Sequence, residues 1–156
     1  MKGFEGYTGK MFESEVLSRL SDSWRREGYF NMSKSYEWVR NNQIWNPSDP
    51  DNKTASDLHF KIAEKLGLEN VNELKFYSAL NSPLDYHYGV DAFFEIGDSV
   101  VTIDLSLNPH KEVAKADIVV HENDLLDEQG IDALATTIST YIQSGKAEVN
   151  RLGEAA

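Results

Sequence analysis

The sequence contains no cysteine, which excludes disulfide bonds, thiolate nucleophiles and cysteine zinc sites. It also lacks any apolar run approaching the roughly 18 residues that a membrane-spanning helix needs. The first ten residues are polar and glycine-rich, unlike a secretory signal peptide. These absences predict a soluble, cytoplasmic protein with no membrane partner.

Positive charge is scarce as well. The chain has 15 lysines and arginines against 26 aspartates and glutamates, which gives a net charge of -11. A protein that binds nucleic acid over a wide surface normally carries a basic patch and a high isoelectric point. Any contact with nucleic acid must therefore be local, and the acidic composition leaves open a protein partner or a role as a mimic of phosphate.

Several catalytic patterns are also missing. The four histidines show neither the HExxH pattern nor another metal-binding spacing. The glycines form neither a P-loop nor a dinucleotide-binding fingerprint, and no serine lies in a GxSxG sequence. The corresponding metalloprotease, nucleotide-binding and serine-hydrolase classes are therefore disfavoured.

The pattern of apolar residues predicts a mixed α/β fold. A length of 156 residues with 40% hydrophobic content suits one domain with a real core, expected at 1–145 and followed by a flexible tail at 146–156. Periodicity predicts helices at 8–27, 54–66 and 131–142, strands at 74–80 and 117–120, and a hairpin at 92–103 between those strands.

Aromatic residues are concentrated in the segment 28–55, among polar residues and prolines. Aromatic rings beside arginine and lysine can stack on nucleic-acid bases. Rings in such a segment can also pack an irregular stretch of chain onto the core, which is the interpretation we favour. The five residues are Tyr29, Phe30, Tyr36, Trp38 and Trp45.

The hairpin at 92–103 brings two aspartates together. Its apolar runs flank Gly97-Asp98, a dipeptide typical of hairpin turns. Counting outward from the turn places Asp91 directly opposite Asp104, with Cβ atoms roughly 5 Å apart. Like charges in these positions repel, so the pair requires a cation or a proton on one carboxyl group. Alternatively both aspartates lie at solvated strand ends, although Asp104 interrupts an apolar run rather than bounding it.

Glu13 is the carboxylate of interest in the first predicted helix. Helical spacing aligns it with Leu17, Leu20 and Trp24, on the edge of the core-facing stripe. A charge in this position requires a partner or has a function. The alternative is a boundary glutamate whose carboxylate reaches water.

The order of elements, with Glu13 in the first helix, Gly89-Val90-Asp91 opening one strand and Asp104 in the next, resembles the PD-(D/E)XK nuclease superfamily. The resemblance implies a restriction-endonuclease-like core and a DNA substrate, with DNA favoured over RNA. It also implies that Asp91, Asp104 and Glu13 hold one or two Mg²⁺ (or Mn²⁺) ions. The backbone carbonyl of Leu105 would complete the coordination.

The resemblance covers about residues 9–27 and 74–142 and leaves 28–73 as an insertion. Its motifs are short, and such short patterns also arise by chance. The independent register argument for the two aspartates adds weight to the match.

One position departs from the family pattern. The lysine expected two residues after the second carboxylate is replaced by Ser106, which lies on the same face as Asp104 and carries no charge. Lys111 is then the first candidate for a displaced lysine, and Lys115 is the second. His110 could also approach the aspartates from a strand end, although a surface histidine is the simpler interpretation.

These residues predict metal-ion hydrolysis of phosphodiester bonds, with Asp91 and Asp104 holding the metal and Lys111 orienting water or stabilising the oxyanion. The competing prediction is a catalytically degenerate, acidic protein that binds a protein partner or mimics DNA. The missing lysine and the net charge of -11 favour this second class. The sequence leaves a homodimer open.

Overall fold

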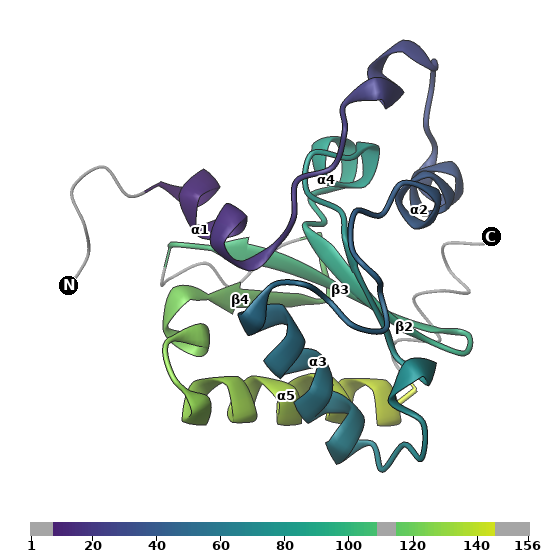
Figure 1. Cartoon of the computed structure of the whole chain (residues 1–156). Helices are drawn as coiled ribbons and strands as arrows, with labels where there is room; N and C mark the ends of the chain where they lie inside the picture. Colours follow the sequence, from purple (N-terminus) through teal and green to yellow (C-terminus); the bar gives the residue numbers. More distant parts are fainter. Residues whose placement is uncertain (1–7, 109–114, 146–156) are drawn as a thin grey trace.

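The computed structural model describes residues 8–108 and 115–145 (Figure 1). Within these residues the chain is a mixed α/β protein built on a four-stranded sheet of order β1-β2-β3-β4. The first three strands pair antiparallel, and the fourth is parallel to the third. The predicted α/β class is therefore confirmed. The strands are β1 (Lys75–Ser78), β2 (Ala92–Ile96), β3 (Ser99–Ser106) and β4 (Ile118–His121).

The hairpin of β2 and β3 has the predicted turn and register. Ile96 pairs with Ser99, and the ladder continues to Ala92 opposite Ile103. Gly97 adopts the left-handed conformation with φ +57°, which glycine adopts without a steric penalty. The turn residues therefore set the register of the central strand pair.

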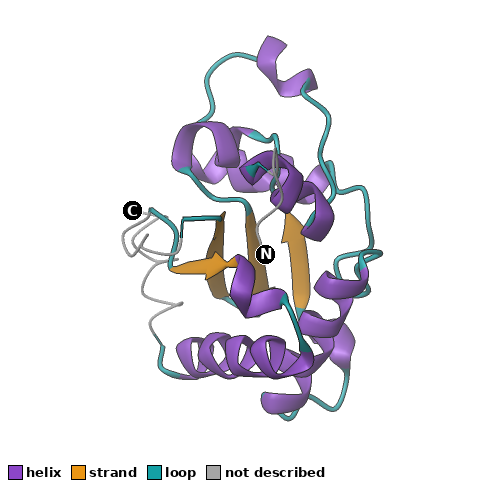
Figure 2. Ribbon diagram, turned by 90° about the vertical axis from the view of Figure 1, so that its left-hand side faces the viewer, coloured by secondary structure: helices purple, strands orange, loops and turns teal. Residues whose placement is uncertain are grey.

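One face of the sheet is covered by α3 (Lys53–Lys65) and α5 (Glu128–Gln143), which pack against each other (Figures 1 and 2). Both helices were predicted, and their apolar faces join alternate residues of the strands in one core. This core includes Leu58, Ile62, Phe94, Val101, Ile103, Leu105, Val120, Leu134 and Ile138.

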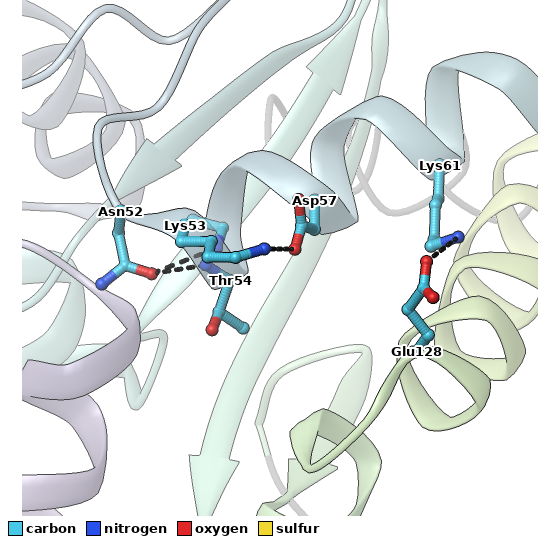
Figure 3. A network of polar contacts seen from close by, with 7 residues as sticks. Asn52, Lys53, Thr54, Asp57, Lys61 and Glu128 are labelled. Carbon is cyan, nitrogen blue, oxygen red and sulfur yellow. Dashed lines mark hydrogen bonds and ion pairs between the residues drawn. The ribbon is translucent and has the colours of Figure 1, made fainter.

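Figure 3 shows how α3 is fixed at its beginning and against α5. The Asn52 side chain caps the helix by accepting from the backbone N–H groups of Thr54 and Ala55 at 2.9 and 3.2 Å. The helix therefore begins at Lys53, one residue before the predicted start at Thr54. Lys61 of α3 forms a 3.9 Å ion pair with Glu128 of α5.

The opposite face carries an aromatic core. It is covered by the 3₁₀ helix η1 (Ser23–Arg26), α2 (Met32–Asn41) and α4 (Pro83–Tyr88). Four of the five aromatic residues at 28–55 are buried, in agreement with the favoured interpretation, and Tyr29 is 80% exposed. The second core includes Leu20, Trp24, Phe30, Tyr36, Trp38, Val39, Leu84, Phe93 and Val100.

The predicted helix at 8–27 is wrong beyond its first half. The helix α1 (Gly9–Val16) ends because Leu17 is extended, with ψ 153°. The chain then runs along the end of β1, where Leu20 N–H donates to Leu80 O at 2.9 Å and Ser18 O accepts from the Ser78 hydroxyl. These distant bonds replace the bonds that a continued helix would have made.

The segment 28–73, expected as an insertion, contributes α2 to one helical layer and α3 to the other. The helix α4, which lies between β1 and β2, was not predicted. Most of the crossover between β3 and β4 lies outside the described residues. Where the chain returns, Thr102 N–H donates to Asp117 Oδ2 at 2.9 Å and Asp117 N–H donates to Thr102 Oγ1 at 2.8 Å, which fixes the start of β4 beside β3.

None of the helices within 8–108 and 115–145 combines the length and the hydropathy needed to cross a membrane.

Candidate functional site: a cluster of buried carboxyl groups

Asp91 and Asp104 are both buried, with 3% and 8% of their surfaces exposed. The predicted direct pairing is wrong, because β2 begins at Ala92. The Asp91 N–H donates at 2.8 Å to the carbonyl of Ile103, which already faces Ala92 in the ladder. Two residues of one strand therefore oppose one residue of the other, which is a β-bulge.

The bulge redirects the Asp91 side chain. Its Oδ2 atom accepts a hydrogen bond from the backbone N–H of Leu105 at 2.8 Å. Leu105 directly follows Asp104 in β3. The Asp91 carboxyl group therefore meets β3 one residue beyond Asp104, although the two aspartates are not cross-strand partners. Bulges often lie beside functional sites, where they re-aim a side chain.

Asp85 is a member of the site that the sequence analysis missed. It lies in the first turn of α4, and its carboxyl group forms a hydrogen bond with that of Asp91. Its Oδ2 atom also accepts from the backbone N–H of Asn81 at 2.8 Å. The signal was present in the sequence, because Ser82 as N-cap, Pro83 at the first helical position and an acidic residue in the first turn are typical of a helix start.

Glu13 comes to the same place from α1. Its carboxyl group is half-buried, and its pKa is raised to about 7. Burial is the largest cause, followed by repulsion from the charges of Asp85 and Asp104, while Arg19 and Lys10 act in the opposite direction. Glu13 therefore lies within electrostatic reach of Asp85 and Asp104.

The pKa of Asp91 is raised further, to about 10. Burial is again the main cause, and the carboxylates of Asp85 and Glu13 add to it, whereas the bond from Leu105 N–H favours the charged form. At neutral pH Asp91 is therefore protonated and can donate to Asp85. The sequence analysis expected a proton or a cation for the pair of Asp91 and Asp104, whereas the carboxylates that raise the pKa of Asp91 are those of Asp85 and Glu13.

The position of the missing lysine is occupied by Ser106, as the sequence requires. Its Oγ atom accepts from the Asn108 N–H at 3.1 Å, and its neighbour in the parallel ladder is His121 of β4. The Nδ1 atom of His121 is buried and forms no hydrogen bond within the residues that the structure describes. The side chain of Leu105 belongs to the apolar core, so only its backbone is available to the site.

Of the two candidate lysines, only Lys115 lies within the described residues. Lys111 and the auxiliary candidate His110 lie outside the described residues. Lys115 is exposed, and its aliphatic chain runs past Gly89, where an added Cβ would lie 3.8 Å from its Cδ atom. Gly89 ends α4 two residues before Asp91, so Lys115 lies beside the turn that leads into the site.

The described residues contain no three aspartate, glutamate or histidine side chains gathered closely enough to hold a metal ion together. The donors are nevertheless of the type that Mg²⁺ prefers, since carboxylates offer hard oxygen ligands. A proton now relieves the repulsion between Asp91 and Asp85, and a divalent cation relieves the same repulsion when it replaces that proton. The chemical type of these donors therefore suits a divalent metal, whereas their spacing among the described residues does not form a set of three ligands.

Comparisons with known proteins find no matching family model, no matching curated protein and no matching solved structure.

Proposed function

We propose that this chain is a metal-dependent nuclease with a restriction-endonuclease-like core, hydrolysing phosphodiester bonds in DNA. One observation carries the proposal. Four carboxyl groups, from α1, α4, the bulge before β2 and the strand β3, converge at one end of the sheet, where their burial and mutual repulsion raise the pKa values of Glu13 and Asp91. Strongly perturbed acids gathered from separate elements are typical of functional sites.

The sheet topology supports the same proposal. A helix precedes an antiparallel meander of three strands, and a fourth strand then pairs in parallel with the third. This is the order expected from the resemblance to the PD-(D/E)XK superfamily. The crossover between β3 and β4 is short for that family.

When bound, Mg²⁺ or Mn²⁺ would lower the pKa of a water ligand and neutralise charge on the scissile phosphate. Asp91, Asp104 and Glu13 would hold it through carboxylate oxygens, and the Leu105 carbonyl is a further candidate ligand. Asp91 must release its proton for this role, and Asp85, its hydrogen-bond partner, keeps that carboxyl group oriented.

A positive group must complete such a site. Ser106 cannot supply it, because its hydroxyl is neutral. Lys115 is the candidate with a described position, beside the turn leading to Asp91, where its ammonium group could orient water or stabilise the oxyanion. Lys111 keeps the same proposed role from the adjoining segment.

The test is a cleavage assay on single- and double-stranded DNA and on RNA, with Mg²⁺ or Mn²⁺. We expect Asp91→Asn and Asp104→Asn to abolish cleavage, and Lys115→Ala or Lys111→Ala to reduce it on the order of 100-fold, the loss typical of removing one oxyanion-stabilising group. Asp98→Asn, in the exposed hairpin turn, is the matched control and should cleave like the wild type. Cleavage that survives both site variants would show that the activity lies elsewhere or is a contaminant.

A second candidate function is a degenerate nuclease fold that binds a protein partner, favoured by the neutral Ser106 in the position of the lysine. Titration with Mn²⁺ separates the two functions. The nuclease should bind the metal in the micromolar to millimolar range and lose it in Asp104→Asn, whereas a degenerate module should show no binding that depends on this residue. A DNA mimic would use carboxylates along an exposed ridge, to which the buried Asp91 and Asp104 cannot contribute.

A further inference from the structure

A group of stacked side chains lies beside the carboxyl cluster, on η1 and α4. The Arg25 guanidinium lies 4.6 Å from the centroid of the Trp24 ring and 4.8 Å from that of Tyr86. The two rings are 5.8 Å apart, centroid to centroid. Trp24 is buried, whereas Tyr86 is 65% exposed and Arg25 is also exposed. We call these three residues the platform.

The platform is anchored through its buried member, Trp24. The Trp24 indole N–H donates to the carbonyl of Asn81 at 2.8 Å, and its ring meets Phe30 edge-on at 6.1 Å within the aromatic core. A buried tryptophan with its polar atom bonded is held in one orientation. Tyr86 and Arg25 therefore pack against a fixed ring and are themselves exposed at the surface.

Asn81 also connects the platform to the carboxyl cluster. Its carbonyl accepts from Trp24, and its N–H donates to Asp85 Oδ2. It holds these two bonds in the left-handed conformation, at φ 72°. In α4 itself, Tyr86 directly follows Asp85. Asn81 therefore links the platform to Asp85, the hydrogen-bond partner of the proposed metal ligand Asp91.

This surface carries positive charge from η1, where Asp22 and Glu27 are exposed as well. Arg25 and Arg26 are both exposed at the end of η1, and neither forms an ion pair with a carboxylate in the described part of the chain. A further exposed ring, Tyr29, reaches Tyr88 of α4 through a hydrogen bond between their side chains. Exposed rings and unpaired arginines form the local attraction for nucleic acid that an acidic protein requires.

We infer that the platform binds the unpaired bases of a single-stranded nucleic acid and directs the strand into the carboxyl cluster. An exposed ring beside a planar cation stacks on any base whose face is free, and every base has such a face. A duplex keeps its bases stacked on one another and would need a wider basic surface, which the net charge of -11 does not favour. This inference deepens the proposed function by naming its substrate, and it rests on that function for the fate of the bound strand.

The test is binding of a fluorescein-labelled DNA strand of about 12 nucleotides, a length within the site sizes of single-strand binders. Fluorescence anisotropy is measured at low salt in EDTA, so that binding is observed without metal and without cleavage. Removal of a stacking ring or of the planar cation beside it should weaken binding about fivefold or more. We expect this loss for Tyr86→Ala and for Arg25→Ala. Tyr86→Phe keeps the ring and should bind like the wild type.

Phe60→Ala is the matched control for loss of an exposed ring, because Phe60 is 56% exposed on α3, which covers the other face of the sheet. It should leave the affinity unchanged. Circular dichroism and thermal unfolding of each variant show that a weakened affinity is not caused by misfolding. An RNA strand and a DNA duplex of the same sequence complete the series. The RNA strand identifies which single strand the platform prefers, and the duplex should bind more weakly than either.

Failure of this inference can be distinguished from failure of the proposed function. Equal affinity of wild type, Tyr86→Ala and Arg25→Ala overturns the platform even when the protein cleaves DNA. Equal or tighter binding of the duplex, or no binding of any strand, overturns it as well. Platform-dependent binding with no cleavage under any metal supports the platform and overturns the nuclease.

Discussion

The two sides of β3 have different chemistry although both are buried. On the side facing α3 and α5, the strand presents Val101, Ile103 and Leu105 to an apolar core. On the other side it presents Thr102, Asp104 and Ser106, each of which is also buried. Polar groups lose the solvation of water on burial and are retained only where hydrogen bonds, partners or a function compensate. The apolar side of β3 therefore supplies stability, whereas the polar side costs stability and contains the candidate site.

The largest effect on stability is expected on the apolar side of β3. Phe94 is fully buried and stacks on Phe76 with ring centroids 4.0 Å apart. Phe94→Ala should lower the free energy of unfolding by about 3–5 kcal/mol, because the lost ring leaves a cavity. Urea unfolding measures this value, and Phe60→Ala, at an exposed position, should change it by no more than about 0.5 kcal/mol. A small loss at Phe94 would show that this core is loosely packed.

The buried carboxyl groups on the polar side should make the stability of the protein depend on pH. The pKa of Asp91 is raised from 3.8 to about 10, so between these values the folded protein holds a proton that the unfolded chain releases. Stability should therefore fall as the pH rises from about 4 towards 10, with a slope of up to about 1.4 kcal/mol per pH unit from this group.

Asp91→Asn should flatten that dependence and stabilise the metal-free protein at neutral and alkaline pH. Unfolding is measured in EDTA at a series of pH values, with Asp98→Asn as the exposed control. A wild-type profile that is flat between pH 5 and 9, or one that Asp91→Asn leaves unchanged, would contradict the assigned proton.

A middle-sized effect is expected where α5 begins. A Cβ atom on Gly130 would lie 2.8 Å from the backbone carbonyl oxygen of Asp124, which cannot move aside as a side chain can. Gly130→Ala should therefore cost about 1–3 kcal/mol of stability, the usual range for overpacking. Gly9→Ala is the control, since nothing lies within 4 Å of its added Cβ. Thermal unfolding of the two variants should differ in this direction, and equal melting temperatures would contradict it.

The smallest effect is expected at the start of α3. Asn52→Ala removes the acceptor for the first free N–H groups of that helix and should cost about 1 kcal/mol. Lys53→Ala, one residue along, removes an exposed ion pair with Asp57 and should have no measurable effect. Urea unfolding compares the two, and a larger loss for Lys53→Ala would reverse our ranking of the cap above the ion pair.

The sequence predicted the elements whose signals are local. Gly97-Asp98 determined the hairpin register, and a strict helical period marked α3 and α5. The helix α1 was overextended because the stripe continuing through Leu20 and Trp24 does belong to a core, but to the second one. Bonds from Leu20 to residues distant in the sequence, at the end of β1, decide where the helix ends, and no local pattern reports such bonds.

The site was predicted in its membership more than in its geometry. Asp91, Asp104 and Glu13 were named as candidates, but the hydrogen-bond partner of the Asp91 carboxyl group is Asp85 rather than the predicted Asp104. The bulge at Asp91 could not be predicted, because it depends on a single backbone bond to Ile103. Asp85 was missed because α4 is a short helix with no apolar period, although its capping residues could have indicated it.

The hairpin that fixes the sheet register also suggests an order of assembly. Its contacts are local and close quickly, whereas α1 must reach β3 across most of the intervening chain, with a larger loss of chain entropy. We expect the strand pair to form first and Glu13 to join the aspartates late in folding. In pulse-labelling hydrogen exchange, the Phe94 amide would then gain protection before the Leu17 amide. A chain that folds in this order keeps its candidate site open until its scaffold is complete.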